Sequence, residues 1–139
     1  MNLQAFIDEM NEQDSRARAN YHLTLGGLKD ALENAPDSLP VVFNDGVGAN
    51  YIDSYRGYYT DLAISDCKPV DPIMSVAEWR GVVEEALATT FQGYKGGDYP
   101  ATPGKPLWRS EWGKASSEAI IDVRVESDRF VLMTKRIDD

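Results

Sequence analysis

The sequence is poor in the side chains on which most catalytic and metal sites depend. Its 139 residues include one cysteine, Cys67, and one histidine, His22. A single cysteine excludes an intrachain disulfide and a cysteine-based zinc site, and a single histidine argues against a Cys–His nucleophile pair. The Gly-x-Ser-x-Gly motif of serine hydrolases and the His-Glu-x-x-His motif of zinc proteases are also missing. We therefore expect a protein that binds rather than catalyses, with no cofactor and no metal.

Basic residues are scarce as well. Fourteen Lys and Arg face 23 Asp and Glu, which gives a net charge of −9. Neutralising phosphates requires a basic face, so the balance argues against direct nucleic-acid binding and against anionic membranes. No apolar run approaches the roughly 18 residues of a membrane span, and the N-terminus carries acids instead of the basic region of a signal peptide. We expect a cytosolic protein whose acidic surface keeps it soluble or docks onto a basic protein groove.

Helical periodicity appears in three segments. Apolar residues Leu3, Phe6, Ile7 and Met10 share one face of a helix that we expect to end at about 17–19. We treat residues 1–20 as an N-terminal extension and 21–139 as one domain. The stripe is expected to pack on its own domain, with a second subunit, and hence a homo-oligomer, as the alternative.

Capping residues mark the other two helices. The hydroxyl of Thr24 can cap a helix that Pro36 ends, because the residue before a proline avoids helical angles. Ser75 and Glu78 have the spacing of a capping box, and the apolar periodicity that follows extends to about Thr89. Both helices should therefore begin close to these residues.

Strand patterns occupy much of the rest. Residues 40–43 form a short apolar run, 58–65 alternate, 106–109 form a short candidate strand, and 119–134 form a hairpin with its turn at 127–128. Together with the helices they predict an α+β domain. We expect an antiparallel or mixed sheet of four or five strands, with about three helices packed mainly on one face.

Two stretches combine tyrosine, glycine and a cation. Residues 51–59 hold four of the seven tyrosines together with Arg56, and residues 91–99 hold two more with Lys95. Tyrosine has an apolar ring and a polar tip, arginine stacks on rings, and glycine lets a ligand approach the backbone. We interpret the first stretch, after a loop at 44–50, as a loop that runs into a strand, and the second as part of a loop over 92–105.

These stretches could together hold a nucleotide. Lys95, Arg56 and the backbone N–H groups of the glycines would bind phosphate, while a tyrosine ring would stack on the base. Alternatively, the tyrosines are core residues and the glycines only turn the chain. Trp108 and Trp112 could line the same site, a subunit interface or the core. The predicted ligand-binding residues are Tyr55, Arg56, Tyr58, Tyr59, Tyr94, Lys95, Gly96, Gly97 and Tyr99.

Carboxylates offer a weaker hypothesis. Asp45, Asp53, Asp61 and Asp98 could converge on Mg²⁺ or form an acid–base pair. Aspartates in loops more commonly hydrogen-bond to their own backbone, which is the competing interpretation. His22, beside Tyr21 and just before a helix, is expected to be a surface or capping residue.

The two stretches also carry a family resemblance. Residues 53–64 (DSYRGYYTDLAI) and 91–99 (FQGYKGGDY) resemble blocks in a group of small bacteriophage proteins, mostly uncharacterised, and the likeness extends over roughly residues 24 to 136. The resemblance implies a phage accessory protein in the host cytoplasm that counters host defence. Such a protein would sequester a nucleotide-type immune signal, or it would be an anti-CRISPR-like inhibitor of a host defence protein. A nuclease or phosphodiesterase that uses the aspartates is the third possibility.

Overall fold

The computed structural model describes residues 3–55, 61–92, 98–111 and 114–137, which form three helices and eight strands. The helices begin and end close to the predicted positions. Thr24 Oγ1 accepts a hydrogen bond from Gly27 N (3.1 Å), and both bonds of the Ser75–Glu78 capping box are present. The elements are α1 (Leu3–Arg18), α2 (Leu25–Glu33), β1 (Val41–Phe43), β2 (Ala49–Ser54), β3 (Leu62–Asp66), α3 (Val76–Leu87), β4 (Thr90–Gln92), β5 (Asp98–Pro100), β6 (Leu107–Glu111), β7 (Lys114–Val125) and β8 (Phe130–Arg136).

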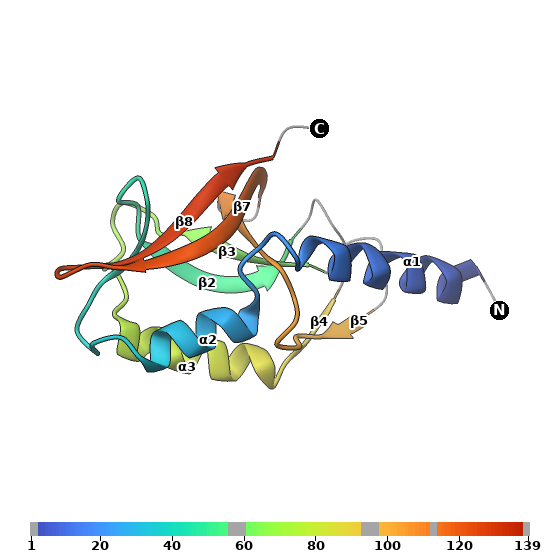
Figure 1. The fold of residues 1–139 in the computed structure, drawn as a ribbon, viewed down its shortest axis with the longest axis horizontal. Helices are drawn as coiled ribbons and strands as arrows, with labels where there is room; N and C mark the ends of the chain where they lie inside the picture. Colours follow the sequence, from blue (N-terminus) through green and yellow to red (C-terminus); the bar gives the residue numbers. More distant parts are fainter. Residues whose placement is uncertain (1–2, 56–60, 93–97, 112–113, 138–139) are drawn as a thin grey trace.

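Six strands form one curled sheet in the order β1-β8-β7-β6-β3-β2, and β4 and β5 form a separate pair (Figure 1). β1 is parallel to β8 and β3 to β6, while the other pairs are antiparallel. The sheet curls until Val42 of one edge strand bridges Gly48, the residue before the other edge strand. The predicted α+β class and mixed sheet are confirmed. The predicted four or five strands are wrong, because the main sheet alone has six.

The additional strands lie where loops were expected. β2 begins inside the predicted 44–50 loop, because Gly46, at φ +87°, completes a tight turn between β1 and β2. Phe43 N donates to Val47 O (2.8 Å) across this turn. β4 and β5 lie at either end of the glycine-rich segment, where Phe91 pairs with Tyr99. The glycine-rich composition identified the turns but concealed the short strands that flank them.

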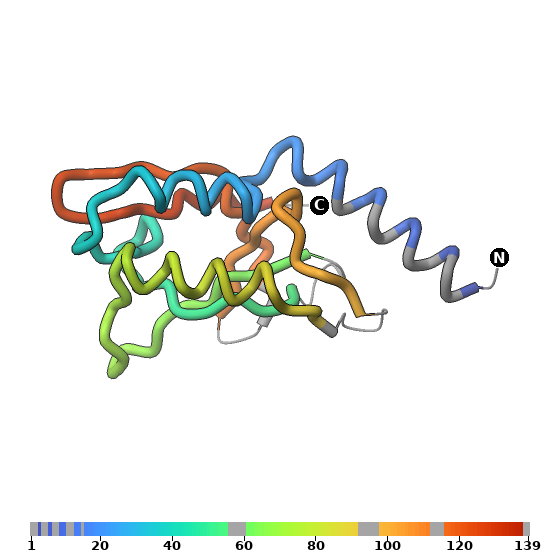
Figure 2. The backbone as a smooth tube through the Cα atoms, turned by 90° about the horizontal axis from the view of Figure 1, so that it is seen from below, coloured from blue at the N-terminus to red at the C-terminus, as the bar shows by residue number. Residues whose placement is uncertain are grey.

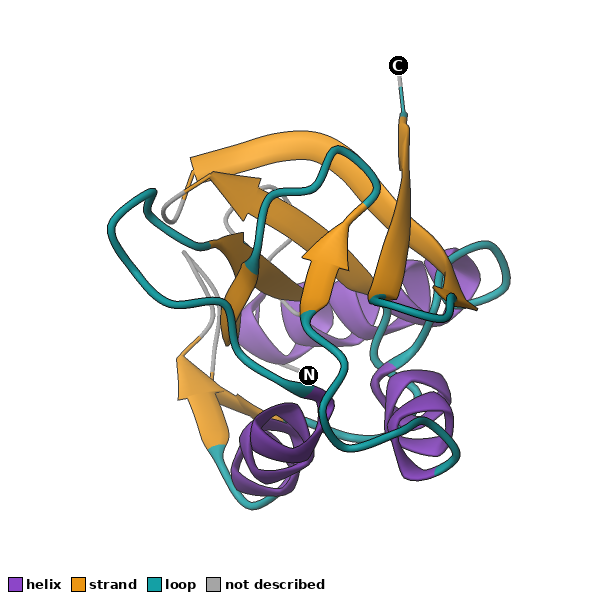
Figure 3. Cartoon of the chain, turned by 90° about the vertical axis from the view of Figure 1, so that its left-hand side faces the viewer, coloured by secondary structure: helices purple, strands orange, loops and turns teal. Residues whose placement is uncertain are grey.

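α2 and α3 lie side by side on one face of the sheet (Figures 1 and 3). Leu25, Leu28 and Leu32 of α2 and Trp79 of α3 are buried in the core that these helices share with the strands. Trp79 Nε1 donates to Ala49 O (3.1 Å), so the largest core side chain is also satisfied as a donor. The expectation that helices pack mainly on one face holds for this pair.

α1 is different, because it extends away from the rest of the chain and has the N-terminus at its far end (Figures 1 and 2). Leu3, Phe6 and Met10 are 74%, 51% and 48% exposed. These three side chains therefore do not pack on their own domain as we expected. Within the described residues, no helix is long and apolar enough to span a membrane.

The segment after α1 is built into the sheet. Leu23 N donates to Ile120 O of β7 (2.8 Å), and Leu107 N of β6 donates to Leu23 O (3.0 Å). Leu23 thus bridges β6 and β7 where their direct pairing has ended. This insertion fixes the base of α1 against the sheet face opposite to α2 and α3.

Candidate binding site

An aromatic cluster lies on that opposite face, centred on Trp108 of β6. The Tyr55 ring stacks on the Trp108 ring with centroids 4.6 Å apart and planes 2° apart. The His22 ring meets the Trp108 ring edge-on at 4.6 Å and 65°. Tyr55 and Trp108 are each 2% exposed and form a small second core with Ala63 and Ala119. Three segments that are distant in sequence therefore meet at one indole ring.

A buried carboxylate completes the cluster. Asp61 is fully buried, and its Oδ2 accepts from Trp108 Nε1 at 2.8 Å. Arg18, in the last turn of α1, binds the same carboxylate through two hydrogen bonds, Nε to Oδ2 (2.5 Å) and an Nη to Oδ1 (2.9 Å). A bidentate arginine is the partner that best offsets the cost of burying a carboxylate. This ion pair neutralises the cluster and ties α1 to the sheet.

Tyr99 connects the two tyrosine–glycine stretches. Its hydroxyl lies 2.8 Å from Ser54 Oγ and 2.9 Å from the backbone oxygen of Asp61. Burial raises the pKa of Tyr99 well above its ordinary value, and nearby Asp61 raises it further, against the opposing hydrogen bond to Ser54. The phenol therefore keeps its proton at neutral pH and donates to the carbonyl. Ser54 belongs to the first stretch, Asp61 follows it closely, and Tyr99 belongs to the second stretch, so the described ends of the two stretches meet in space.

His22 has one ring nitrogen committed. Its Nδ1 lies 3.0 Å from Leu107 O, and a carbonyl can only accept, so Nδ1 carries the proton. Burial lowers the pKa of His22, and the Leu107 hydrogen bond and the charge of Asp61 oppose this only in part. The imidazole is therefore neutral at pH 7, with Nε2 as an acceptor. This places His22 as a packing and hydrogen-bonding residue of the cluster, and not as the surface or capping residue that we expected.

The structure describes two of the nine predicted ligand residues, and both are buried. Tyr55 has one ring face covered by Trp108, and its hydroxyl accepts from Ser117 N (3.0 Å). The Tyr99 ring belongs to the main core, and the ammonium of buried Lys105 lies 5.1 Å from its centroid. These two tyrosines hold the stretches together. The other seven lie outside the described residues: Arg56, Tyr58, Tyr59, Tyr94, Lys95, Gly96 and Gly97.

The aspartates considered for metal binding point to different partners. Asp45 pairs with Arg109 (2.9 Å), Asp61 with Arg18, and Asp53 accepts from the adjacent Ser54 N (2.8 Å). In the described part of the chain, no three His, Cys, Asp or Glu residues form a metal-binding group. Convergence of these three aspartates on one metal is therefore contradicted.

A second buried ion pair was not predicted from the sequence. Arg109, on the core side of β6, binds Asp66 through Nε to Oδ1 (2.6 Å) and an Nη to Oδ2 (3.1 Å). Its guanidinium also lies 4.2 Å from the centre of the Phe43 ring. Burial would lower the pKa of Arg109, but the hydrogen bonds to Asp66 and Asp45 raise it overall. The group is a fixed cation that ties β6 to β3 and to the β1–β2 turn.

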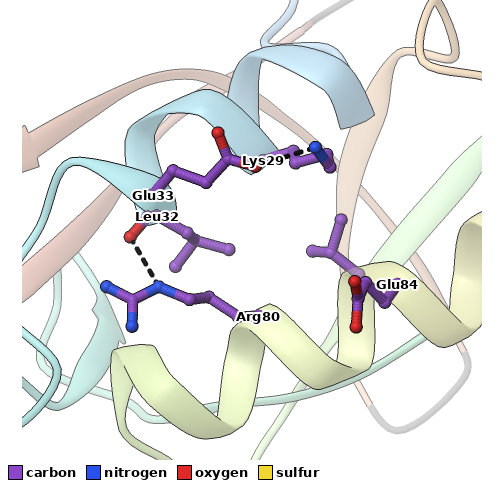
Figure 4. A pocket seen from close by; sticks show the side chains of 6 residues that line it. Lys29, Leu32, Glu33, Arg80 and Glu84 are labelled. Atoms are coloured by element: carbon purple, nitrogen blue, oxygen red, sulfur yellow. Dashed lines mark hydrogen bonds and ion pairs between the residues drawn. The ribbon is translucent and has the colours of Figure 1, made fainter.

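A cavity of about 260 Å³ lies between α2 and α3. Figure 4 shows Arg80 reaching across it to the carbonyl oxygen of Leu32 at the end of α2 (3.0 Å). Arg80 also donates to Ala35 O (2.8 Å) and pairs with Asp37. Since Arg80 satisfies carbonyls that the helix end leaves open, we assign this cavity to helix packing. Its lining is Lys29, Leu32, Glu33, Arg80, Val83 and Glu84.

Comparisons with protein-family models, curated proteins and solved structures found no match to this chain. The function is therefore argued from the cluster itself. Three residues central to it were absent from the predicted site: Arg18, Asp61 and His22. No local signal in the sequence pairs Arg18 with Asp61, because the two residues lie 43 positions apart.

Proposed function

We propose that this protein binds and sequesters a nucleotide-type signal where the two tyrosine–glycine stretches meet, and that it does so as a phage accessory protein countering host defence. The observation that carries the proposal is the Tyr99 hydroxyl bonded to Ser54 and to Asp61. It brings the described ends of the two stretches together. The phage context rests on the family resemblance alone.

The described residues support a division of labour. Tyr55 and Tyr99 are buried and hold the stretches, so the ligand contacts fall to the remaining predicted residues. Arg56 and Lys95 would bind phosphate, and an unburied tyrosine ring would stack on the base. Because Arg18 already neutralises Asp61, the buried carboxylate would not repel an anionic ligand bound nearby. An acidic protein can thus keep a locally cationic site.

Isothermal titration calorimetry tests the proposal. The titrants are cyclic mononucleotides, cyclic dinucleotides and cyclic ADP-ribose derivatives. Losing one charge-assisted phosphate contact costs about 1.5–3 kcal/mol, so Arg56→Ala and Lys95→Ala should each weaken binding roughly 10- to 150-fold.

Matched controls remove an exposed cation elsewhere: Arg124→Ala on β7 and Lys68→Ala after β3. Both controls should bind like the original chain. If no nucleotide produces a heat of binding, the proposal is refuted. If the control variants lose as much affinity as Arg56→Ala and Lys95→Ala, binding depends on general charge and not on this site. Unchanged thermal melting of each variant shows that folding is intact.

A protein-binding inhibitor is the second candidate, and one observation favours it. The net charge is −9, and α1, with exposed Glu9 and Asp14, extends from the body as an accessible acidic element. Such a surface would occupy a basic groove of a host nucleic-acid-binding defence complex. Affinity for that complex should then fall steeply as salt rises from about 0.05 to 0.5 M, because screening shortens the reach of surface charges. Capture that is insensitive to salt contradicts this reading.

A further inference from the structure

Exposed large apolar side chains gather in two places, along α1 and beside its base. One is the stripe along α1, formed by Leu3, Phe6 and Met10. The other is a pocket of about 300 Å³ beside His22 that leaves Tyr21, Ile121 and Ile137 exposed. Exposed apolar patches of this kind mark interaction surfaces. The pocket is lined by Tyr21, His22, Ala119, Ile121, Lys135 and Ile137.

The α1 stripe has the spacing of a helix-pairing surface. Residues 3, 6, 10 and 17 are separated by three, four and seven positions, and this spacing places them along one seam of the helix. All four residues are exposed. The helix has 16 residues and is about 24 Å long at 1.5 Å per residue. That length is enough for its tip to reach the base of an antiparallel partner helix.

The helix cannot fill the pocket of its own chain. The pocket lies past the C-terminal end of α1, beside Tyr21 and His22, whereas Leu3 and Phe6 lie near the opposite end. The base of α1 is held by the Arg18–Asp61 ion pair and by Leu23 in the sheet, so the helix cannot fold back. An α1 tip that enters such a pocket must therefore come from another molecule.

We propose that two copies of this chain pair through antiparallel α1 helices, each placing Leu3 and Phe6 against the pocket of the other. Charge favours this occupant. Before Arg16, α1 carries Asp8, Glu9, Glu12 and Asp14 and no basic residue, whereas Lys135 is the one charged residue among the described residues that line the pocket. Antiparallel pairing sets the acidic part of one helix opposite the basic end of the other and beside this lysine. The interface is isologous and closes as a dimer.

Light scattering coupled to size exclusion, with the full chain over a concentration series, measures the assembly. We expect a mass approaching twice 15.5 kDa. Phe6→Asp on the helix and Ile121→Asp in the pocket should each shift the chain to monomer. Val70→Asp alters a side chain that is 89% exposed in the loop after β3 and should leave the dimer intact. All three positions are exposed, so circular dichroism should show unchanged folding.

Mixing the two interface variants tests the reciprocal arrangement. The Phe6→Asp chain keeps a good pocket and the Ile121→Asp chain keeps a good helix, so the mixture should form a heterodimer with one intact junction. A monomer at every concentration overturns the proposal. So does a dimer that survives both variants. If Phe6→Asp breaks the dimer and Ile121→Asp does not, the pocket is not the docking site. That result would mean that α1 pairs only with the α1 of the other copy.

Discussion

Asp61 is fully buried, and Arg18 and Trp108 both donate hydrogen bonds to its carboxylate. Replacing Arg18 by alanine removes the arginine and leaves the hydrogen bond from Trp108 Nε1. Two charge-assisted hydrogen bonds disappear at once. Removing one partner of a buried ion pair costs about 3–5 kcal/mol, because the other charge stays desolvated. The Arg18 side chain is 18% exposed, so water can enter the vacated space and the loss should be near the lower value, about 3 kcal/mol. A domain of this kind has about 5–15 kcal/mol of total stability.

Urea unfolding followed by far-UV circular dichroism measures this loss, and a double-mutant cycle assigns it to the pair. Asp61→Asn keeps the shape but turns an amide donor toward a guanidinium or indole donor, so it should also destabilise. The double variant should be less destabilised than the sum of the single variants by at least about 1.5 kcal/mol. Arg129→Ala, which breaks a partly exposed ion pair with Glu126, should have a clearly smaller effect, because solvent screens such a pair. Additive single variants, or a loss for Arg18→Ala no larger than this control, would refute the reasoning.

Three further predictions concern Tyr99, His22 and Ser117. Tyr99→Phe removes a buried hydroxyl and should lower the unfolding free energy by about 1–2 kcal/mol in urea titrations, whereas a neutral result would mean that the two stretches are not joined there. His22 is the only histidine in the sequence, and its pKa in the folded chain lies below the ordinary 6.5. As the pH drops through about 6.5, the unfolded chain binds a proton before the folded chain does, so the unfolding free energy should fall. His22→Gln should reduce this pH dependence in thermal melts between about pH 7.5 and 5.5. Ser117 has φ +61°, so Ser117→Gly should raise the unfolding free energy by up to about 1 kcal/mol, and a destabilised variant would show that its side chain matters more than its backbone.

Local signals in the sequence were sufficient for the helices and the hairpin. Thr24, Ser75 and Glu78 specify helix starts through hydrogen bonds that span three residues, and the alternation over 119–134 identifies β7 and β8. Short strands carry less information. β4 and β5 have three residues each and β5 ends in a proline, so the glycine-rich composition between them dominated the prediction.

The candidate site depends on contacts that no local pattern encodes. Arg18 and Asp61 are 43 positions apart, and Tyr99 and Ser54 are 45 apart. The sequence identified Tyr55 and Tyr99 as important because of their composition, but it assigned them to ligand contact. Burial against Trp108 and in the core gives them a supporting position instead. Only the fold could show which tyrosines face inward.

The placement of Leu23 between β6 and β7 also bears on how the chain folds. Its backbone groups find their partners at Leu107 and Ile120, close to the other end of the sequence. Contacts between such distant positions close large loops and form slowly. During synthesis α1 leaves the ribosome before β6 and β7, so its base can be fixed only after these two strands have been made. A segment synthesised before these strands is thus among the last to reach its final position, and completing the sheet and orienting α1 become a single late step.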